Sequence, residues 1–212
     1  MASAQEALDR LQEGNRRFVS GMQCSGTQPD HFRRALSLEQ QDPFAIILGC
    51  SDSRVPAEIV FNQGLGDLFV IRVAGNIVAP SQIGSVEFAA SRFDISLVVV
   101  LGHSQCGAVL ATLDHLHEQS VQQFSEHSRS IVDRIRPAIE HLLDSDDPLD
   151  SAELCESAVR ANVNASVAQL RHESGILKHL IDEKEMRIVG AEYSLETGEV
   201  GFFESLQETE HA

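Results

Sequence analysis

Three short apolar runs stand out in the first half of the chain: PFAIILGC, FVIRVAG and SLVVVLGH. Each run is rich in β-branched residues and ends at a glycine or a polar residue. Apolar residues fill these runs continuously and do not alternate with polar ones, which is typical of strands buried on both faces of a parallel sheet. We therefore predict three buried strands that run parallel to one another.

Helical patterns occupy most of the remaining chain. An N-terminal helix is predicted to begin with a capping box formed by Ser3 and Glu6. Between the strands, PAEIVFN opens with Pro56 at a first-turn position, and SQIGSVEFAASRF has Ser81 as its expected cap. Longer helices are predicted in GAVLATLDHLHEQ, SEHSRSIVDRIRPAIEHLL and LCESAVRANVNASVAQLR, and Pro137 is expected to kink the second of them.

The last part of the pattern predicts a hairpin, because MRIVGAEYSLETGEVGFF reads as a strand, a turn near Thr197–Gly198 and a return strand. Strands that alternate with helices indicate the α/β class, here with a mostly parallel central β-sheet flanked by helices. The sequence has no internal repeat and no linker, so we expect a single domain over 1–212. Its predicted parts are an N-terminal helical arm over 1–40, with a second short helix over 31–40, an α/β core over 41–205 and an acidic tail over 206–212.

The composition narrows the function classes. The formal net charge is −16, which argues against nucleic acid and anionic membranes as partners because both require a basic face. The apolar runs fall short of the ~18 residues that a membrane span needs. The N-terminus lacks the basic-then-apolar pattern of a signal peptide. We therefore expect a cytoplasmic protein with no nucleic-acid or membrane partner.

Two of the predicted strands end in metal-binding residue types. Cys50 closes the first strand, His103 closes the third, and Cys106 follows at the start of a helix. The other two cysteines, Cys24 and Cys155, match no ligand pattern. Ligand sites in open parallel sheets lie at the carboxyl ends of the strands, so we expect the sheet to bring the first three residues together.

Two thiolates and one imidazole suit zinc, and three protein ligands leave a fourth position open to water or substrate, as in catalytic zinc sites. Each of these residues taken alone is more often a buried core residue, and the H-x-x-C spacing by itself is a weak signal. Their joint position at strand ends favours the metal hypothesis.

The acid and the base that follow Cys50 fit the same site. Asp52 is placed to accept a proton from a zinc-bound water, and Arg54 to keep Asp52 ionised in a bidentate pair. The alternative interpretation is a surface ion pair worth ~1 kcal/mol or less. Because two thiolates offset the charge of Zn²⁺, the bound water should be acidified less than to the pKa of ~7 that three neutral histidines give. We therefore expect activity to favour mildly alkaline pH.

The blocks CSDSRVPAE, GDLFVIRVAGN, GSVEFA and VVVLGHSQCGAV together resemble the β-class carbonic anhydrases, most densely over residues 41–110. The resemblance implies a zinc-dependent enzyme that reversibly hydrates carbon dioxide to bicarbonate and a proton. The implied reaction is attack of zinc-bound hydroxide on CO2, with Asp52 and Arg54 as the orienting dyad. It also implies one zinc ion per chain, bound by Cys50, His103 and Cys106.

The same resemblance implies a substrate site and an assembly. The residues that match the family's substrate-binding positions are Gln41, Phe69, Ala74 and Gly107, with alanine at position 74 where the family often has valine. Phe69 and Ala74 are often contributed by the partner subunit, since family members assemble as homodimers or homotetramers. In these assemblies the N-terminal helix reaches across the partner, although a helix packed on its own chain fits the sequence pattern equally well.

In one branch of the family, low pH and bicarbonate switch the enzyme off, and the aspartate of C-x-D-x-R becomes the fourth zinc ligand. This chain matches the anion pocket of that branch at Gly49, Arg72 and Tyr193 but carries Ile47 in place of tryptophan. We therefore expect a pH-dependent closed state with Asp52 on zinc, without strong control by bicarbonate.

Three other functions compete with this interpretation. A hydrolase of carbon disulfide or carbonyl sulfide would use the same zinc ligands on an equally linear, apolar substrate. A non-catalytic zinc-stabilised binding protein is disfavoured by the Asp52–Arg54 pair, because a structural site would have a closed fourth ligand. A nucleotide site at GLGDLF is disfavoured because a phosphate-binding loop follows a strand, whereas these glycines precede one.

Overall fold

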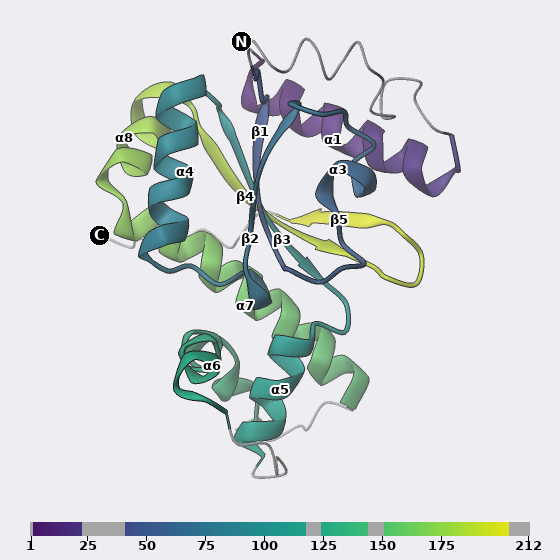
Figure 1. Ribbon diagram of the computed structural model, residues 1–212, viewed down its shortest axis with the longest axis vertical. Helices are drawn as coiled ribbons and strands as arrows, with labels where there is room; N and C mark the ends of the chain where they lie inside the picture. Colours follow the sequence, from purple (N-terminus) through teal and green to yellow (C-terminus); the bar gives the residue numbers. More distant parts are fainter. Residues whose placement is uncertain (1, 23–40, 118–123, 144–150, 204–212) are drawn as a thin grey trace, which may run out of the picture.

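The computed structural model describes residues 2–22, 41–117, 124–143 and 151–203 of the chain. These residues form a five-stranded sheet in the order β2-β1-β3-β4-β5. Four strands are parallel, namely β1 (Ala45–Gly49), β2 (Leu68–Arg72), β3 (Leu97–His103) and β4 (Arg187–Tyr193). β5 (Val200–Phe203) returns antiparallel to β4, so the predicted hairpin and the mostly parallel α/β fold are confirmed (Figure 1).

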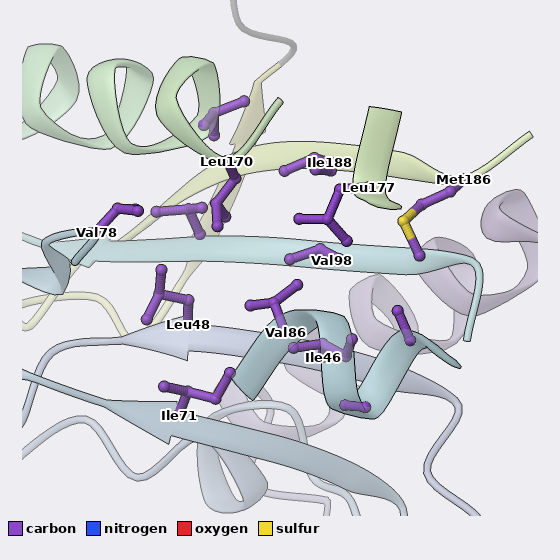
Figure 2. Packing of buried hydrophobic residues seen from close by; sticks show 14 of the residues in the cluster. Ile46, Leu48, Ile71, Val78, Val86, Val98, Leu170, Leu177, Met186 and Ile188 are labelled. Atoms are coloured by element: carbon purple, nitrogen blue, oxygen red, sulfur yellow. The ribbon is translucent and has the colours of Figure 1, made fainter. Parts of the chain in front are cut away.

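Helices cover both faces of the sheet (Figure 1). One face carries α1 (Ala4–Val19) and the short α3 (Ala57–Val60), and the other carries α4 (Pro80–Phe93), α7 (Ser151–Glu173) and α8 (Gly175–Lys184). β1 and β3 are buried along their whole length, which explains why their apolar residues are continuous. The prediction of a third buried strand is wrong for β2, which lies at the edge of the sheet and is only partly buried. Figure 2 shows the core on the second face, where strand residues such as Ile46 and Val98 pack against these helices.

A further group of helices extends the molecule beyond the carboxyl ends of the strands (Figure 1). It contains α5 (Gly107–Leu116) and α6 (Glu126–Ile139), which pack on α7, and the 3-10 helix η2 (Glu140–Leu143). The 3-10 turn η1 (Ala74–Asn76) follows β2 and contacts the same helices. Cys50 and Cys106 belong to the buried cluster of this group, so they lie where the sheet meets the helices.

The N-terminal helix α1 packs on its own chain. Its capping box is present as predicted, because the Glu6 amide donates to the Ser3 hydroxyl at 3.2 Å and the Ser3 amide donates to the Glu6 carboxylate at 2.7 Å. The apolar stripe that includes Leu8 and Leu11 is buried against the sheet. That this helix also reaches across a partner subunit stays a prediction.

Helix boundaries differ from the predicted ones in places. The predicted cap at Ser81 is wrong, because Pro80 lies in the first turn and Ala79 is the N-cap residue. A proline in the first turn has no N–H group that would need a capping partner, and its φ is already fixed near the helical value. α6 runs past Pro137, and the chain changes to 3-10 helix only at Glu140. The helix α8 is absent from the sequence prediction.

Several predictions concern parts of the chain that the structure does not describe. The helix over 31–40, Cys24 and the tail over 206–212 lie outside the described residues. The division into arm, core and tail and the cytoplasmic location stay predictions. Within the described ranges, no helix combines the length and the apolar character that crossing a bilayer would require.

Asn15 ties α1 to two other elements. Its buried side-chain amide donates to the carbonyls of Val60 and Gly198, at 3.1 and 2.9 Å. Its side-chain oxygen accepts from the Val200 amide at 2.9 Å. One side chain therefore joins α1 both to the end of α3 and to the hairpin of β4 and β5.

This anchoring predicts a stability effect. Asn15→Ala leaves three backbone groups without this partner, and an unsatisfied buried polar group costs about 1–3 kcal/mol. We expect the free energy of unfolding in urea to fall by about 2 kcal/mol or more. Glu13→Ala, on the exposed side of the same helix, should change it by less than about 0.5 kcal/mol. An Asn15→Ala protein as stable as the wild type would contradict the anchoring role.

Candidate metal centre

The sheet brings the three predicted ligand residues to one point. Cys50 directly follows β1, His103 is the last residue of β3, and Cys106 is the N-cap residue of α5. β1 and β3 are parallel neighbours, so their carboxyl ends lie side by side. The two sulfur atoms and a ring nitrogen of His103 all lie within 4.8 Å of one another, and all three residues are buried. Such a group can hold a single metal ion.

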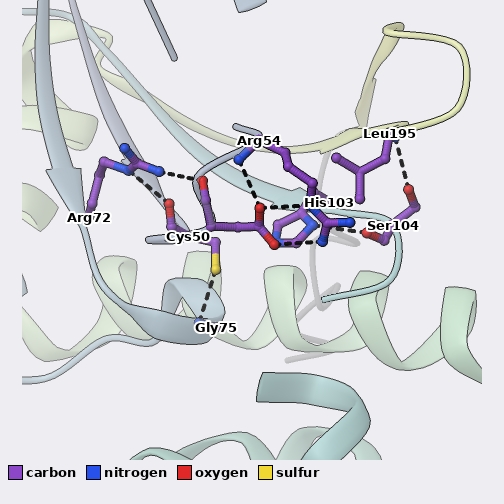
Figure 3. A network of polar contacts seen from close by, with 8 residues as sticks. Cys50, Arg54, Arg72, Gly75, His103, Ser104 and Leu195 are labelled. Carbon is purple, nitrogen blue, oxygen red and sulfur yellow. Dashed lines mark hydrogen bonds and ion pairs between the residues drawn. The ribbon is translucent and has the colours of Figure 1, made fainter. Parts of the chain in front are cut away.

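The ring of His103 is oriented for metal binding. Its Nδ1 lies 2.9 Å from the Ser104 carbonyl oxygen, which can only accept, so Nδ1 carries the proton and Nε2 presents a lone pair. Ser104 is itself held, since its amide donates to the Tyr193 carbonyl. Its hydroxyl accepts from the Leu195 amide at 3.0 Å (Figure 3). Nε2 is buried and has no hydrogen-bond partner among the described residues. A buried nitrogen is costly to leave unpaired, and a metal ion would satisfy it.

The two ligand cysteines influence each other's protonation, and Cys50 is the one that favours the thiolate form. The neighbouring thiol of Cys106 is the main reason why the pKa of Cys50 falls to about 4. Burial opposes this shift, while His103 and the Gly75 amide support it. The pKa of Cys106 is raised in turn, chiefly because of the neighbouring Cys50 sulfur and then because of burial. A divalent cation removes this competition because it stabilises both thiolates at once.

The donor set fits zinc. Two sulfurs and one imidazole nitrogen are typical zinc ligands, whereas hard cations such as Mg²⁺ and Ca²⁺ prefer oxygen. In the part of the chain that the structure describes, no fourth donor meets the same 4.8 Å limit. The group therefore has the three-ligand composition of a catalytic zinc site and lacks the fourth ligand of a structural one.

The carboxylate of Asp52 lies beside this group in a bidentate pair with Arg54. Its Oδ1 accepts from the Arg54 amide and Nε, each at 2.9 Å, and its Oδ2 accepts from Nη2 at 2.7 Å. Oδ2 is also 3.8 Å from Nε2 of His103. The hydrogen bonds from Arg54 hold the pKa of Asp52 well below its usual value, so the carboxylate is ionised and can only accept. A closed state with Asp52 on zinc stays a prediction.

Arg72 holds the loop that carries Cys50 and Asp52. It lies opposite Gly49 in the pairing of β1 with β2. Its Nε donates to the Cys50 carbonyl at 3.0 Å and its Nη2 donates to the Asp52 carbonyl (Figure 3). The sequence pattern contains no local signal for this contact, because it depends on the register between two strands.

The other residues predicted for an anion pocket lie in or beside the sheet. Gly49 ends β1, and Ile47 of the same strand is fully buried. Tyr193 ends β4 and packs near Phe18 of α1, with ring centres 6.5 Å apart. Whether bicarbonate has an effect through these residues stays a prediction.

The four residues predicted to bind substrate come from different parts of the chain, and two of them lie next to residues of the metal centre. Ala74 lies in η1 next to Gly75, whose amide contacts the Cys50 sulfur. Gly107 is the exposed first residue of α5 and directly follows Cys106. Gln41 is exposed ahead of β1, and Phe69 is half-buried on the edge strand β2.

The fold and the site together define an α/β metalloenzyme, with its ligands and an arginine-held carboxylate at the carboxyl ends of parallel strands. The family profile for carbonic anhydrase matches residues 45–200, a range that includes the three ligands and the Asp52–Arg54 pair. This chain belongs to the carbonic anhydrase family, in its β class.

Similar proteins cover most of the chain. The carbonic anhydrase of Mycolicibacterium smegmatis is 42% identical over 194 residues, which make up 92% of this chain and 90% of the relative. Carbonic anhydrase 2 of Mycobacterium tuberculosis is 38% identical over 192 residues, or 91% of this chain and 89% of the relative. Among solved structures, the β-carbonic anhydrase CcaA matches with a TM-score of 0.71 at 28% identity, covering 93% of this chain and 95% of that chain.

The convergence of the ligands predicts a loss of metal when one of them is removed. Cys106→Ser replaces a thiolate by a weakly ligating hydroxyl, so we expect bound zinc to fall from about one per chain to below about 0.1 after dialysis. Elemental analysis measures this ratio. Cys155→Ser is the matched control, because Cys155 is a free cysteine outside the group and should leave the zinc content unchanged. Equal zinc in Cys106→Ser and the wild type would rule out this ligand set.

Proposed function

We propose that this protein is a zinc-dependent enzyme that reversibly hydrates carbon dioxide to bicarbonate and a proton. The observation that carries the proposal is the buried Cys50-His103-Cys106 group beside the ionised Asp52, in a chain of the β-carbonic anhydrase family. A zinc ion bound there would act as a Lewis acid and make a water molecule nucleophilic near neutral pH. The surrounding residues decide how that chemistry is used.

Asp52 has the properties of an orienting acceptor. Both of its oxygens accept from Arg54, which sets the plane of the carboxylate and keeps it ionised. An ionised carboxylate attracts the proton of a nearby water, so the lone pair of that water is left to face the substrate carbon. Arg72 supports this geometry because it binds the backbone of both Cys50 and Asp52.

A small, linear, apolar molecule suits the walls around the ligands. Ile77 and Val109 belong to the same buried cluster as the two ligand cysteines. The residues that we propose for the substrate site are Gln41, Phe69, Ala74 and Gly107. Ala74 and Gly107 are supported by their position next to ligand contacts, and Phe69 is proposed to serve the site of a partner subunit.

We further propose that the protein is a homodimer or homotetramer that uses the edge of the sheet at β2. Phe69 of this strand forms an aromatic cluster with Phe88 and Phe93 of α4, with ring centres 6.1 to 6.3 Å apart. Phe88 is nevertheless 58% exposed. An exposed aromatic cluster beside an edge strand is the kind of surface that a second copy covers.

Stopped-flow measurement of CO2 hydration tests the reaction. The zinc-loaded wild type should be active, and Asp52→Asn should lose about 100-fold or more in kcat/KM because the amide is no longer an ionised acceptor. Asp67→Asn is the matched control, since the Asp67 carboxylate is also paired with an arginine, 3.0 Å from the Arg10 guanidinium. Asp67 directly precedes β2, at the end of the strand away from the metal centre. This control should keep wild-type activity.

Carbon disulfide and carbonyl sulfide belong in the same assay, because both are linear, apolar and compatible with the same ligands. A zinc-loaded protein that hydrolyses them and leaves CO2 unchanged would be a hydrolase on this scaffold. A protein that binds zinc but turns over none of the three substrates would be a zinc-stabilised binding protein. Either result would refute the proposed hydration of CO2.

The proposed interface predicts a change in mass. Phe88→Glu puts a charge into the aromatic cluster, so we expect the oligomer to dissociate toward monomers in size-exclusion chromatography with light scattering. Ile176→Glu is the control, because Ile176 is 48% exposed on α8 and lies outside the cluster. A wild type that is already monomeric, or an unchanged mass in Phe88→Glu, would argue against an interface at this surface.

A further inference from the structure

The backbone turn next to Cys50 is built around a glycine with a positive φ. Gly75 in η1 has φ 68° and ψ 20°, in the left-handed region that favours glycine. Its amide points at the Cys50 sulfur, 3.4 Å away (Figure 3). A Cβ at this position would lie 2.8 Å from Ile135 of α6 and 3.1 Å from Ala108 of α5. These two helices therefore close one side of the turn.

Two buried polar side chains of α7 hold the turn from another direction. Asn162 donates from Nδ2 to the Gly75 carbonyl at 2.8 Å, and Ser166 donates from Oγ to the Asn76 carbonyl at 3.0 Å. The two side chains are one helical turn apart, so they lie on the same face of α7. Asn162 is 2% exposed and Ser166 is 4% exposed. Buried polar groups are stable only when they are paired, and here each of them binds a carbonyl of the turn.

We propose that Asn162 is a positioning residue of the metal centre, which aims the Gly75 amide at the Cys50 thiolate by holding the Gly75 carbonyl. This inference rests on the proposed zinc-dependent function. Groups that hydrogen bond to a metal ligand set its orientation and its strength as a donor. Two thiolates offset the charge of Zn²⁺, and an N–H that draws electron density from one of them keeps the bound ion more electrophilic. The position of Asn162 therefore matters to the metal through its hydrogen bond to the Gly75 carbonyl.

Three variants separate positioning from structural support. Asn162→Ala removes the amide, and Asn162→Asp keeps nearly the same volume but replaces the donor by an acceptor. Ser166→Ala is the matched control from the same buried face. The Ser166→Ala substitution removes the hydrogen bond to the Asn76 carbonyl. This carbonyl is one residue farther along the chain from the Gly75 amide, which contacts the Cys50 sulfur.

The readouts are the visible spectrum of the Co²⁺-loaded proteins and their affinity for Zn²⁺. Both Asn162 variants should shift the thiolate-to-cobalt charge-transfer band to lower energy, because a thiolate without its N–H donor gives up electrons more easily. Their zinc affinity should fall about 10-fold. Ser166→Ala should keep the wild-type band and affinity, even where its thermal unfolding midpoint falls. Wild-type values in both Asn162 variants, or an equal shift in Ser166→Ala, would overturn the proposal.

A measurement on the wild type covers the case in which neither Asn162 variant folds. Protein loaded with the spin-active isotope of cadmium should show an NMR coupling between the metal and the Gly75 amide proton through the Cys50 sulfur. The absence of that coupling would overturn the proposal. Failure of the proposed function looks different, because the zinc-loaded wild type would then not hydrate CO2, whatever the cobalt and cadmium data show.

Discussion

The parallel pairing of β1 with β3 is the constraint on which the metal centre depends. Parallel strands present their carboxyl ends at the same edge of a sheet, and this pairing places Cys50 next to His103. Both strands are covered by helices on both faces, so a change of register would disturb two apolar cores at once. The position of the ligands is therefore set by packing energy that is spread over the whole sheet and not by the ligands themselves.

The polar groups of the centre are held by partners from several elements. The Ser104 carbonyl orients His103, Arg54 holds Asp52, and Arg72 reaches from the neighbouring strand to the carbonyls of Cys50 and Asp52. Burial of such groups is costly unless each one is paired. Among the described residues, four buried side-chain atoms have no hydrogen-bond partner, and Nε2 of His103 is the one that belongs to the ligand group. A metal ion bound by Cys50, His103 and Cys106 would give this nitrogen its partner.

The two edges of the sheet differ in how they are covered. The edge at β5 is tied to α1 through Asn15, which binds the hairpin at Gly198 and Val200. The edge at β2 instead carries an aromatic cluster in which Phe88 remains exposed. The N-terminal helix is thus secured within its own chain, and the apolar surface that we propose for a second subunit lies at the opposite edge.

The sequence by itself determined the three parallel strands, of which β1 and β3 are fully buried and β2 only partly, the capping box of α1 and the residue types of the metal centre. These features depend on the periodicity of burial, on hydrogen bonds within one helical turn and on the chemistry of single side chains, all of which act over short stretches of chain. Only the tertiary structure decided that Arg72 holds the loop of Cys50 and that Asn162 binds the Gly75 carbonyl, 87 residues away. Such contacts arise from strand register and from the packing of α7, and no local pattern carries that information.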